Sequence, residues 1–244
     1  SLLHLTPASY ALVGISWSMS GVPTAGLPDI TFPLTIVTAD HISGYYFAQQ
    51  FGFVETNNPG ATQIGYTGLQ PRPDNNGQTV LHAVFSSFVP GSTTTDAGFC
   101  TSGADGGAGV SCSVEWNGVY GRMYLMEVKN AGNTTWVGTV IDTVTGQRVH
   151  ITRTYLLIGT YKLPTNYGGI ASSQVGFVEW YPWNAGEPAN HCALLPYQKT
   201  IFGVPTTTHP GAVGTEDLAY EYGDCVGEVD FQTVSAGTQA DCGF

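Results

Sequence analysis

The chain has little charge, and basic charge in particular is scarce. Only 10% of its 244 residues are charged, with seven Lys and Arg against 18 Asp and Glu, which gives a formal net charge of −11. The basic residues are scattered singly, whereas phosphate backbones and anionic lipid surfaces are bound by clusters of Lys and Arg. We therefore expect neither nucleic acid nor membrane as a partner.

Long apolar runs and helical periodicity are also missing. No run approaches the roughly 20 residues needed to cross a bilayer. Nowhere do apolar residues recur at helical spacing over three turns. The segment Ser1–Leu5 is too short for a signal peptide, so we expect a mature, processed chain.

The common catalytic signatures are absent too. The sequence contains no H-E-x-x-H, no G-x-S-x-G and no G-x-x-x-x-G-K. Each of these motifs places specific groups for zinc, serine or phosphate chemistry. Zincin, serine hydrolase and nucleotide-binding functions are therefore disfavoured.

What the sequence does contain is period-two alternation, which is typical of strands. Turn clusters rich in Asn, Pro and Gly separate the alternating runs. Many short strands with regular turns predict an all-β, single-domain antiparallel β-sandwich or jelly roll over residues 1–244, lectin-like and with minimal helix. Residues 182–225, rich in Pro and Gly, are expected to form long irregular loops. The predicted strands are 10–18, 30–37, 44–53, 62–70, 78–88, 110–116, 119–129, 134–142, 147–158, 174–181 and 226–233.

Five cysteines point to an oxidising compartment. Cys100 and Cys112 bracket a Gly-rich loop that needs a covalent link to hold its shape, so we predict a disulfide between them. Cys192 is expected to pair with Cys225 or Cys242, which leaves one thiol over. We therefore predict a secreted, extracellular protein, and we expect a monomer. The sequon at Asn133 is a candidate glycosylation site.

Low charge together with five Trp and 13 Tyr suits a protein that binds sugars, because aromatic rings stack on the apolar faces of sugar rings. Strand alternation places Glu179 and Tyr181 on one face and Trp180 on the other. Trp17, Trp136 and Trp180 also fit core positions, whereas Trp183 and Trp116 neighbour turn residues. The candidate carbohydrate-binding residues are Trp183, Trp116, Trp180, Tyr66 and Asn184.

Catalytic candidates come from carboxyl groups beside aromatic residues. Two carboxyls that flank a glycosidic bond can cleave it, and an apolar neighbourhood raises the pKa of the one that acts as acid. Glu115 and Glu179 each adjoin a Trp in a strand-like run. A solvated strand face accounts for the same adjacency.

Metal and cofactor signals are weak. Asp105, and the acidic stretch formed by Glu216, Asp217, Glu221 and Asp224, offer oxygen ligands to calcium but do not match a calcium-loop motif. The cysteines and histidines lack the spacing of a zinc site. We expect no cofactor, with calcium as the one possible metal.

Several stretches taken together resemble the secreted domain-of-unknown-function family 3472. They are residues 45–53, 65–70, 85–86 leading to Cys100, 106–112, 136–146 and 178–181. The resemblance implies an extracellular β-sandwich that sometimes accompanies carbohydrate-related modules. It supports the Cys100–Cys112 pair and draws attention to Gln70 and Glu179, but it supplies no catalytic residue.

Four functions follow as hypotheses. The first is a secreted protein that binds or acts on cell-wall polysaccharide. The second is a glycoside hydrolase or lyase that uses a carboxyl pair. The third is an acid peptidase of the glutamic type, with Gln70 and Glu179 as its pair and activity confined to acid pH. The fourth is a structural or effector protein without a small ligand.

Overall fold

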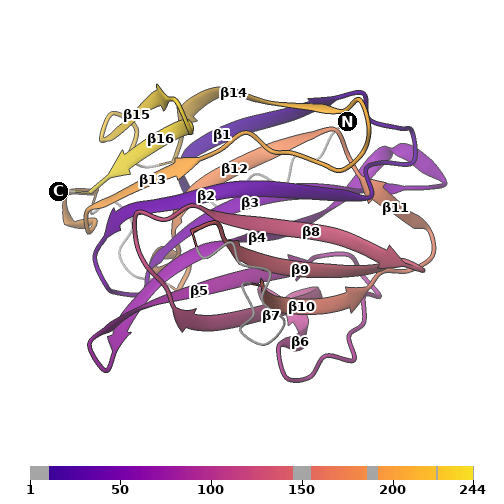
Figure 1. The fold of residues 1–244 in the computed structure, drawn as a ribbon, viewed down its shortest axis with the longest axis horizontal. Coiled ribbons are helices and arrows are strands. Elements are labelled where there is room, and N and C mark those ends of the chain that lie inside the picture. Colours follow the sequence, from indigo (N-terminus) through magenta and orange to yellow (C-terminus); the bar gives the residue numbers. More distant parts are fainter. Residues whose placement is uncertain (1–10, 145–154, 186–191, 224, 244) are drawn as a thin grey trace.

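The structure is a computed structural model that describes residues 11–144, 155–185, 192–223 and 225–243. Two antiparallel sheets face each other in it (Figure 1). The predicted all-β class and antiparallel sandwich are confirmed. In the described part of the chain, helix is limited to two 3-10 segments, η1 (Tyr181–Ala185) and η2 (Cys192–Leu194).

The larger sheet has nine strands in the described chain. Its spatial order is β14 (Val213–Glu221), β1 (Ala11–Ser20), β12 (Ser173–Trp180), β3 (Tyr45–Glu55), β4 (Asn58–Asn75), β5 (Gln78–Ser87), β7 (Gly107–Asn117) and β6 (Cys100–Ala104), with β11 (Tyr167–Ile170) also paired to β3.

The smaller sheet has seven strands in the same described part. Its spatial order is β10 (Tyr155–Lys162), β9 (Thr135–Asp142), β8 (Tyr124–Gly132), β2 (Asp29–Ala39), β13 (Gln198–Phe202), β16 (Gly237–Cys242) and β15 (Val229–Val234).

Aromatic rings fill the space between the sheets. Trp17 on β1 packs edge-on against Phe32 on β2, with ring centroids 5.2 Å apart. Phe53 on β3 packs against Trp136 on β9 at 5.1 Å. Both Trp side chains are buried, as the sequence predicts. Contacts of this kind stabilise a sandwich through area burial and ring geometry.

Strand β3 is buried on both of its faces. Tyr45, Phe47, Phe51 and Phe53 point into the core between the sheets. Tyr46 and Ala48, which alternate with them, join a second, smaller apolar cluster on the opposite face. Because side chains alternate along a strand, β3 links the core to that second face.

Two disulfides occur among the described residues. Cys100–Cys112 joins β6 to β7, with the two Cα atoms 3.9 Å apart, as predicted. Cys192 pairs with Cys225, which decides between the two predicted partners, and Cys242 is a buried free thiol. In the chain-entropy account, closing a loop as short as that between Cys100 and Cys112 contributes about 3 kcal/mol. Disulfides are typical of oxidising compartments.

No helix in the described chain is long and apolar enough to cross a membrane. Secretion remains a prediction.

The prediction of irregular loops over 182–225 is wrong at β13 and β14. Strand β13 buries Gln198 and Thr200 beside Phe202, so two of its three buried positions are polar and the apolar alternation is lost. Strand β14 leaves most of its residues partly or fully exposed. A search for apolar residues at every second position therefore detects neither strand. The part of the predicted strand 147–158 that precedes Tyr155 lies outside the described residues.

The carboxyl of Glu216 on β14 meets β16 at one edge of the sandwich. Its Oε2 atom accepts a hydrogen bond from the Thr238 hydroxyl at 3.2 Å. Burial raises the pKa of Glu216 from 4.5 to about 7, against the opposing effect of the Thr238 hydrogen bonds. The folded protein therefore holds this proton to a higher pH than the unfolded chain does.

We predict that the raised pKa of Glu216 gives a contribution that stabilises the fold more in acid than at neutral pH. Its stability contribution is fully present below about pH 4, where the group is protonated in both states, and falls as pH rises to about 7. Thermal unfolding from pH 4 to 8 should show a smaller loss of midpoint temperature in Glu216→Gln than in the parent. Asp217→Asn, which removes the neighbouring exposed carboxyl, is the matched control. Equal pH dependence in Glu216→Gln and the parent would contradict the prediction.

Candidate functional site

The face of the nine-stranded sheet that points away from the other sheet carries the polar groups of interest. On β3 this face bears Tyr46 and Ala48, and on the neighbouring β12 it bears Phe177. Residues that are paired directly across neighbouring strands point to the same face of a sheet. The residues paired with Tyr46 on the adjacent strands therefore also lie on this outer face.

One row of residues crosses five strands on this outer face. Glu179 on β12 pairs with Tyr46 on β3. The β3–β4 register, continued by one residue, brings Tyr46 beside Gln70. Gln70 pairs with His82 on β5, and His82 pairs with Glu115 on β7. We call this set of five residues the polar row.

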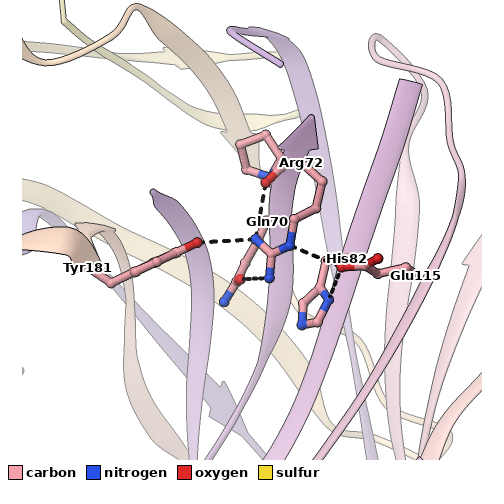
Figure 2. A network of polar contacts seen from close by, with 6 residues as sticks. Gln70, Arg72, His82, Glu115 and Tyr181 are labelled. Carbon is pink, nitrogen blue, oxygen red and sulfur yellow. Dashed lines mark hydrogen bonds and ion pairs between the residues drawn. The ribbon is translucent and has the colours of Figure 1, made fainter. Parts of the chain in front are cut away.

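Arg72 connects the polar row to the 3-10 helix η1 (Figure 2). Its Nη2 donates to the Gln70 Oε1 atom at 2.6 Å, and its Nη1 donates to the Tyr181 hydroxyl oxygen at 3.2 Å. Its Nε donates to the Glu115 Oε1 atom at 3.2 Å, and its Nη1 also reaches the Pro71 carbonyl. Since the guanidinium holds the amide oxygen of Gln70, the amide nitrogen of Gln70 points elsewhere, on the side of Tyr181 in Figure 2.

His82 shares the same carboxylate. Its Nδ1 lies 3.0 Å from the Glu115 Oε1 atom that also accepts from Arg72. Burial lowers the pKa of His82 and the Arg72 charge lowers it further, while Glu115 opposes both effects. The imidazole is therefore biased towards its neutral form in spite of the carboxylate beside it.

Three tyrosines surround Glu179. Burial raises the pKa of Tyr46, Tyr66 and Tyr222, and the Glu179 charge raises each of them further. Their hydroxyls therefore stay protonated and remain hydrogen-bond donors. The hydroxyls of Tyr46 and Tyr222 are buried and have no hydrogen-bond partner, although buried polar groups usually have one.

Together these residues form a site that can act by acid–base chemistry. Glu179 is half-buried and can accept or donate a proton. The Gln70 amide and the tyrosine hydroxyls supply neutral donors, which can stabilise a developing oxyanion. Arg72 holds the amide in one orientation. The site combines the carboxyl of Glu179 with several uncharged donors, and the Asp105 carboxyl is near enough to raise the pKa of Tyr46 and Tyr66 as well.

Gln70 and Glu179, predicted as a pair, lie in the same row with Tyr46 between them. At about 4.8 Å per strand, their Cα atoms are roughly 10 Å apart. Glu115, the other predicted carboxyl, is four strands from Glu179, or roughly 19 Å by the same spacing. Carboxyl pairs that flank a glycosidic bond lie about 5–9.5 Å apart. The proposed Glu115–Glu179 catalytic pair is therefore contradicted.

The predicted aromatic platform does not form. Trp183 is buried in the main core, and Trp180 and Trp116 pack against that core. Trp180 lies edge-on to Tyr45 at 4.9 Å, and Trp116 packs edge-on against Tyr124 at 5.6 Å. Trp180 and Trp116 occupy core-facing positions of their strands, and Trp183 belongs to η1 and packs into the main core.

The two remaining predicted binding residues, Tyr66 and Asn184, lie in different parts of the structure. Tyr66 lies on the outer face, where it packs against Phe88 and Phe177. Asn184 belongs to η1, and its side chain lies outside the described residues. Glu179 and Tyr181 lie on the same outer face of the nine-stranded sheet, as strand alternation predicts.

Asn133 is exposed in the turn between β8 and β9, with a φ of 51°. Its glycosylation remains a prediction. In the parts of the chain that the structure describes, no group of three or more His, Cys, Asp or Glu is arranged to hold a metal ion.

Three residues of the site were not singled out by the sequence. Tyr46, Arg72 and His82 each look ordinary in their own segment, and His82 in particular fits a structural histidine. The signal that unites them is strand register, because residues from β3, β4, β5 and η1 meet only when the strands are paired. An isolated Arg amid apolar and Pro residues is the one local hint, since buried charge needs a partner.

Comparisons with known proteins bear on the fold. No family model and no protein of known function compared by sequence matches the chain, so the resemblance to family 3472 remains a prediction. Among solved structures, the chain is similar to scytalido-glutamic peptidase bound to a peptide-based transition-state analogue, with TM-score 0.48, 14% identity and coverage of 96% of this chain and 98% of that one. It is also similar to SCP-B, a member of the eqolisin family of peptidases in complex with the tripeptide Ala-Ile-His, with TM-score 0.47, 13% identity and coverage of 95% and 98%. Likenesses at this level do not decide the function.

The electrostatic arrangement around His82 predicts opposite effects of two substitutions. Arg72→Met should raise the pKa of His82, because it removes a positive charge that lowers it. Glu115→Gln should lower that pKa, because it removes the carboxylate that opposes the burial effect. Titration of His82 by NMR in the parent and both variants measures this directly. Shifts of the same sign in the two variants would contradict the arrangement.

The core position of Trp183 predicts a stability effect. Trp183→Ala should destabilise the fold by about 3–5 kcal/mol, because it empties a large buried site. Phe231→Ala, at a side chain that is 41% exposed, is the control and should change stability by less than about 0.5 kcal/mol. Urea unfolding of the three proteins tests this. Similar midpoints for Trp183→Ala and Phe231→Ala would place Trp183 at the surface instead.

Proposed function

We propose that the protein is a hydrolase of amide bonds in polypeptides that works in acid, with Glu179 as its acid–base residue and Gln70 as its amide donor. The observation that carries the proposal is the polar row, in which Glu179, Tyr46 and Gln70 occupy neighbouring strands on one face. Arg72 fixes the Gln70 oxygen and so leaves the amide N–H groups for a substrate.

The geometry supports a simple sequence of proton transfers. The Glu179 carboxylate takes a proton from a water molecule as the water oxygen attacks the carbonyl carbon of the bound amide. The oxyanion that forms accepts hydrogen bonds from the Gln70 amide N–H and the Tyr46 hydroxyl. Protonated Glu179 then gives its proton to the leaving nitrogen as the C–N bond breaks. The carboxylate is thereby regenerated, and the products are a carboxylic acid and an amine.

The chemistry of the site fits acyl transfer better than glycoside cleavage. Hydrolysis of an amide needs one group to move protons and donors to stabilise an oxyanion. Hydrolysis of a glycoside by the common mechanism needs two carboxyls about 5–9.5 Å apart. The polar row has a carboxyl at each end, and Glu115 is roughly 19 Å from Glu179 at the usual strand spacing and is bound to Arg72 and His82. Glu179 is therefore the carboxyl of the row that lies beside neutral donors.

The uncharged state of the surrounding donors also supports work in acid. The tyrosines and the Gln70 amide keep the same protonation state throughout the acid range, so they remain hydrogen-bond donors there. A carboxyl that both accepts and gives a proton is most effective near the pH at which carboxyls ordinarily titrate, about 4.

Incubation of the protein with an unfolded, reduced and alkylated polypeptide at pH 3–8, followed by mass spectrometry, tests the proposal. We expect new peptide termini in the acid range. Glu179→Gln should lower the rate by about 10²–10⁴-fold, since it removes the group that transfers protons. Gln70→Ala should lower kcat by about 10²–10³-fold, since it removes an oxyanion donor.

Glu127→Gln, on β8 of the other sheet, is the matched control and should keep the activity of the parent. Insoluble cell-wall polysaccharides in parallel incubations test the carbohydrate hypothesis. Release of sugars without peptide products, or peptide cleavage that survives Glu179→Gln, would overturn the proposed function.

A further inference from the structure

A cavity lies at the edge of the sandwich where β14 meets the β15–β16 hairpin, segments that gather beside the C-terminal end in Figure 1. Its volume is about 950 Å³. Apolar side chains line part of it, among them Met123, Val204 and Leu218. Hydroxyl groups and the two adjacent carboxyls of β14 line the rest. None of these lining residues belongs to the polar row.

Glu216 is one of the residues that line this cavity. One carboxyl oxygen, Oε2, accepts from the Thr238 hydroxyl. The other, Oε1, is buried and has no hydrogen-bond partner. A buried acceptor without a partner costs free energy that a ligand donor would recover. The described lining contains Asp217 as its only other charged group and no Lys, Arg or His, so the matching donor is a cation.

The strand that carries Glu216 is also an edge. In the described chain β14 is the outermost strand of the nine-stranded sheet and pairs only with β1. Apolar side chains stand out from it, with Leu218 87% exposed and Val213 60% exposed. An edge strand with free backbone groups is a template for an added extended segment.

The negative charge of this edge favours a basic polypeptide segment over a second copy of the chain as the partner. Pairing of β14 with β14 of a second copy would bring Glu216 and Asp217 of one copy close to those of the other, and like charges in register are destabilising. A segment with a basic side chain gains charge complementarity at the same place. Its alternate side chains would reach the cavity, because side chains of an added strand alternate as in any sheet.

We propose that β14 and this cavity form a binding site for an extended polypeptide segment that carries a Lys or Arg. The segment adds a strand to the free edge of β14 and directs its basic group to the Oε1 atom of Glu216. Apolar residues of the segment pack against Leu218 and Val213. The site does not depend on the proposed catalytic function, since none of its groups belongs to the polar row.

NMR titration with a blocked heptapeptide, Thr-Val-Thr-Lys-Thr-Val-Thr, tests the proposal at pH 8 on the whole chain. Chemical-shift changes should fall on the backbone amides of β14 and on Thr238. A peptide with norleucine in place of Lys should bind at least about tenfold more weakly, because it lacks the charge-assisted hydrogen bond. Glu216→Gln should weaken binding of the Lys peptide by a similar factor.

Two further variants separate binding from folding. Leu218→Lys changes an exposed residue, so the fold should be kept while the added positive charge weakens binding. Asp217→Asn should weaken it less than Glu216→Gln does. Binding should be weaker at pH 5, where burial keeps Glu216 protonated and uncharged. Absence of binding, equal affinity for the Lys and norleucine peptides, or shifts away from β14 would overturn the proposal.

Discussion

The burial of β3 on both faces is the constraint on which the other features depend. Its inward rings complete the core between the sheets, and its outward Tyr46 lies between Glu179 and Gln70. A shift of one residue in either flanking register would exchange the two faces and expose the core rings. Core packing therefore fixes the register, and the register in turn fixes which polar groups meet on the outer face. The geometry of the site is a consequence of how the core is filled.

Because the chain has few charged residues, the protonation of its polar groups depends mainly on burial. Arg72 is the cation that binds three members of the site network, and Glu115 balances it at the more exposed end. At the other end, Glu179 lies among tyrosines that stay neutral, and desolvation is the main influence on their protonation. The same effect acts on Glu216 at the far edge of the sheet. Burial, more than ion pairing, adjusts proton affinity in this protein.

Much of the fold could be predicted from alternation and turn residues, because apolar period-two runs such as those of β1, β3 and β5 directly reflect a buried face. Strands β13 and β14 could not, since one buries Gln198 and Thr200 and the other is largely exposed. The loop disulfide followed from its Gly-rich spacing. The pairing of Cys192 required the fold, because sequence alone leaves the connectivity open.

The site was predictable only in part. Gln70 and Glu179 were named from their segments, yet the residues that join them, Tyr46 and Arg72, depend on strand pairing. The Trp residues show the opposite error, because proximity to turns suggested exposure for Trp183, whereas this residue of η1 is buried in the main core. Local sequence indicates which residue types are present, whereas long-range register decides which of them meet.

The central claim is that a polypeptide is bound and cleaved on the outer face of the nine-stranded sheet, across the polar row. Its most direct test is a crystal structure of the inactive Glu179→Gln variant soaked with an uncleaved polypeptide segment. The account predicts that a substrate carbonyl lies between residue 179 and Gln70, with its oxygen within hydrogen-bond distance of the Gln70 amide nitrogen. A segment bound elsewhere, with the polar row unoccupied, would contradict the account.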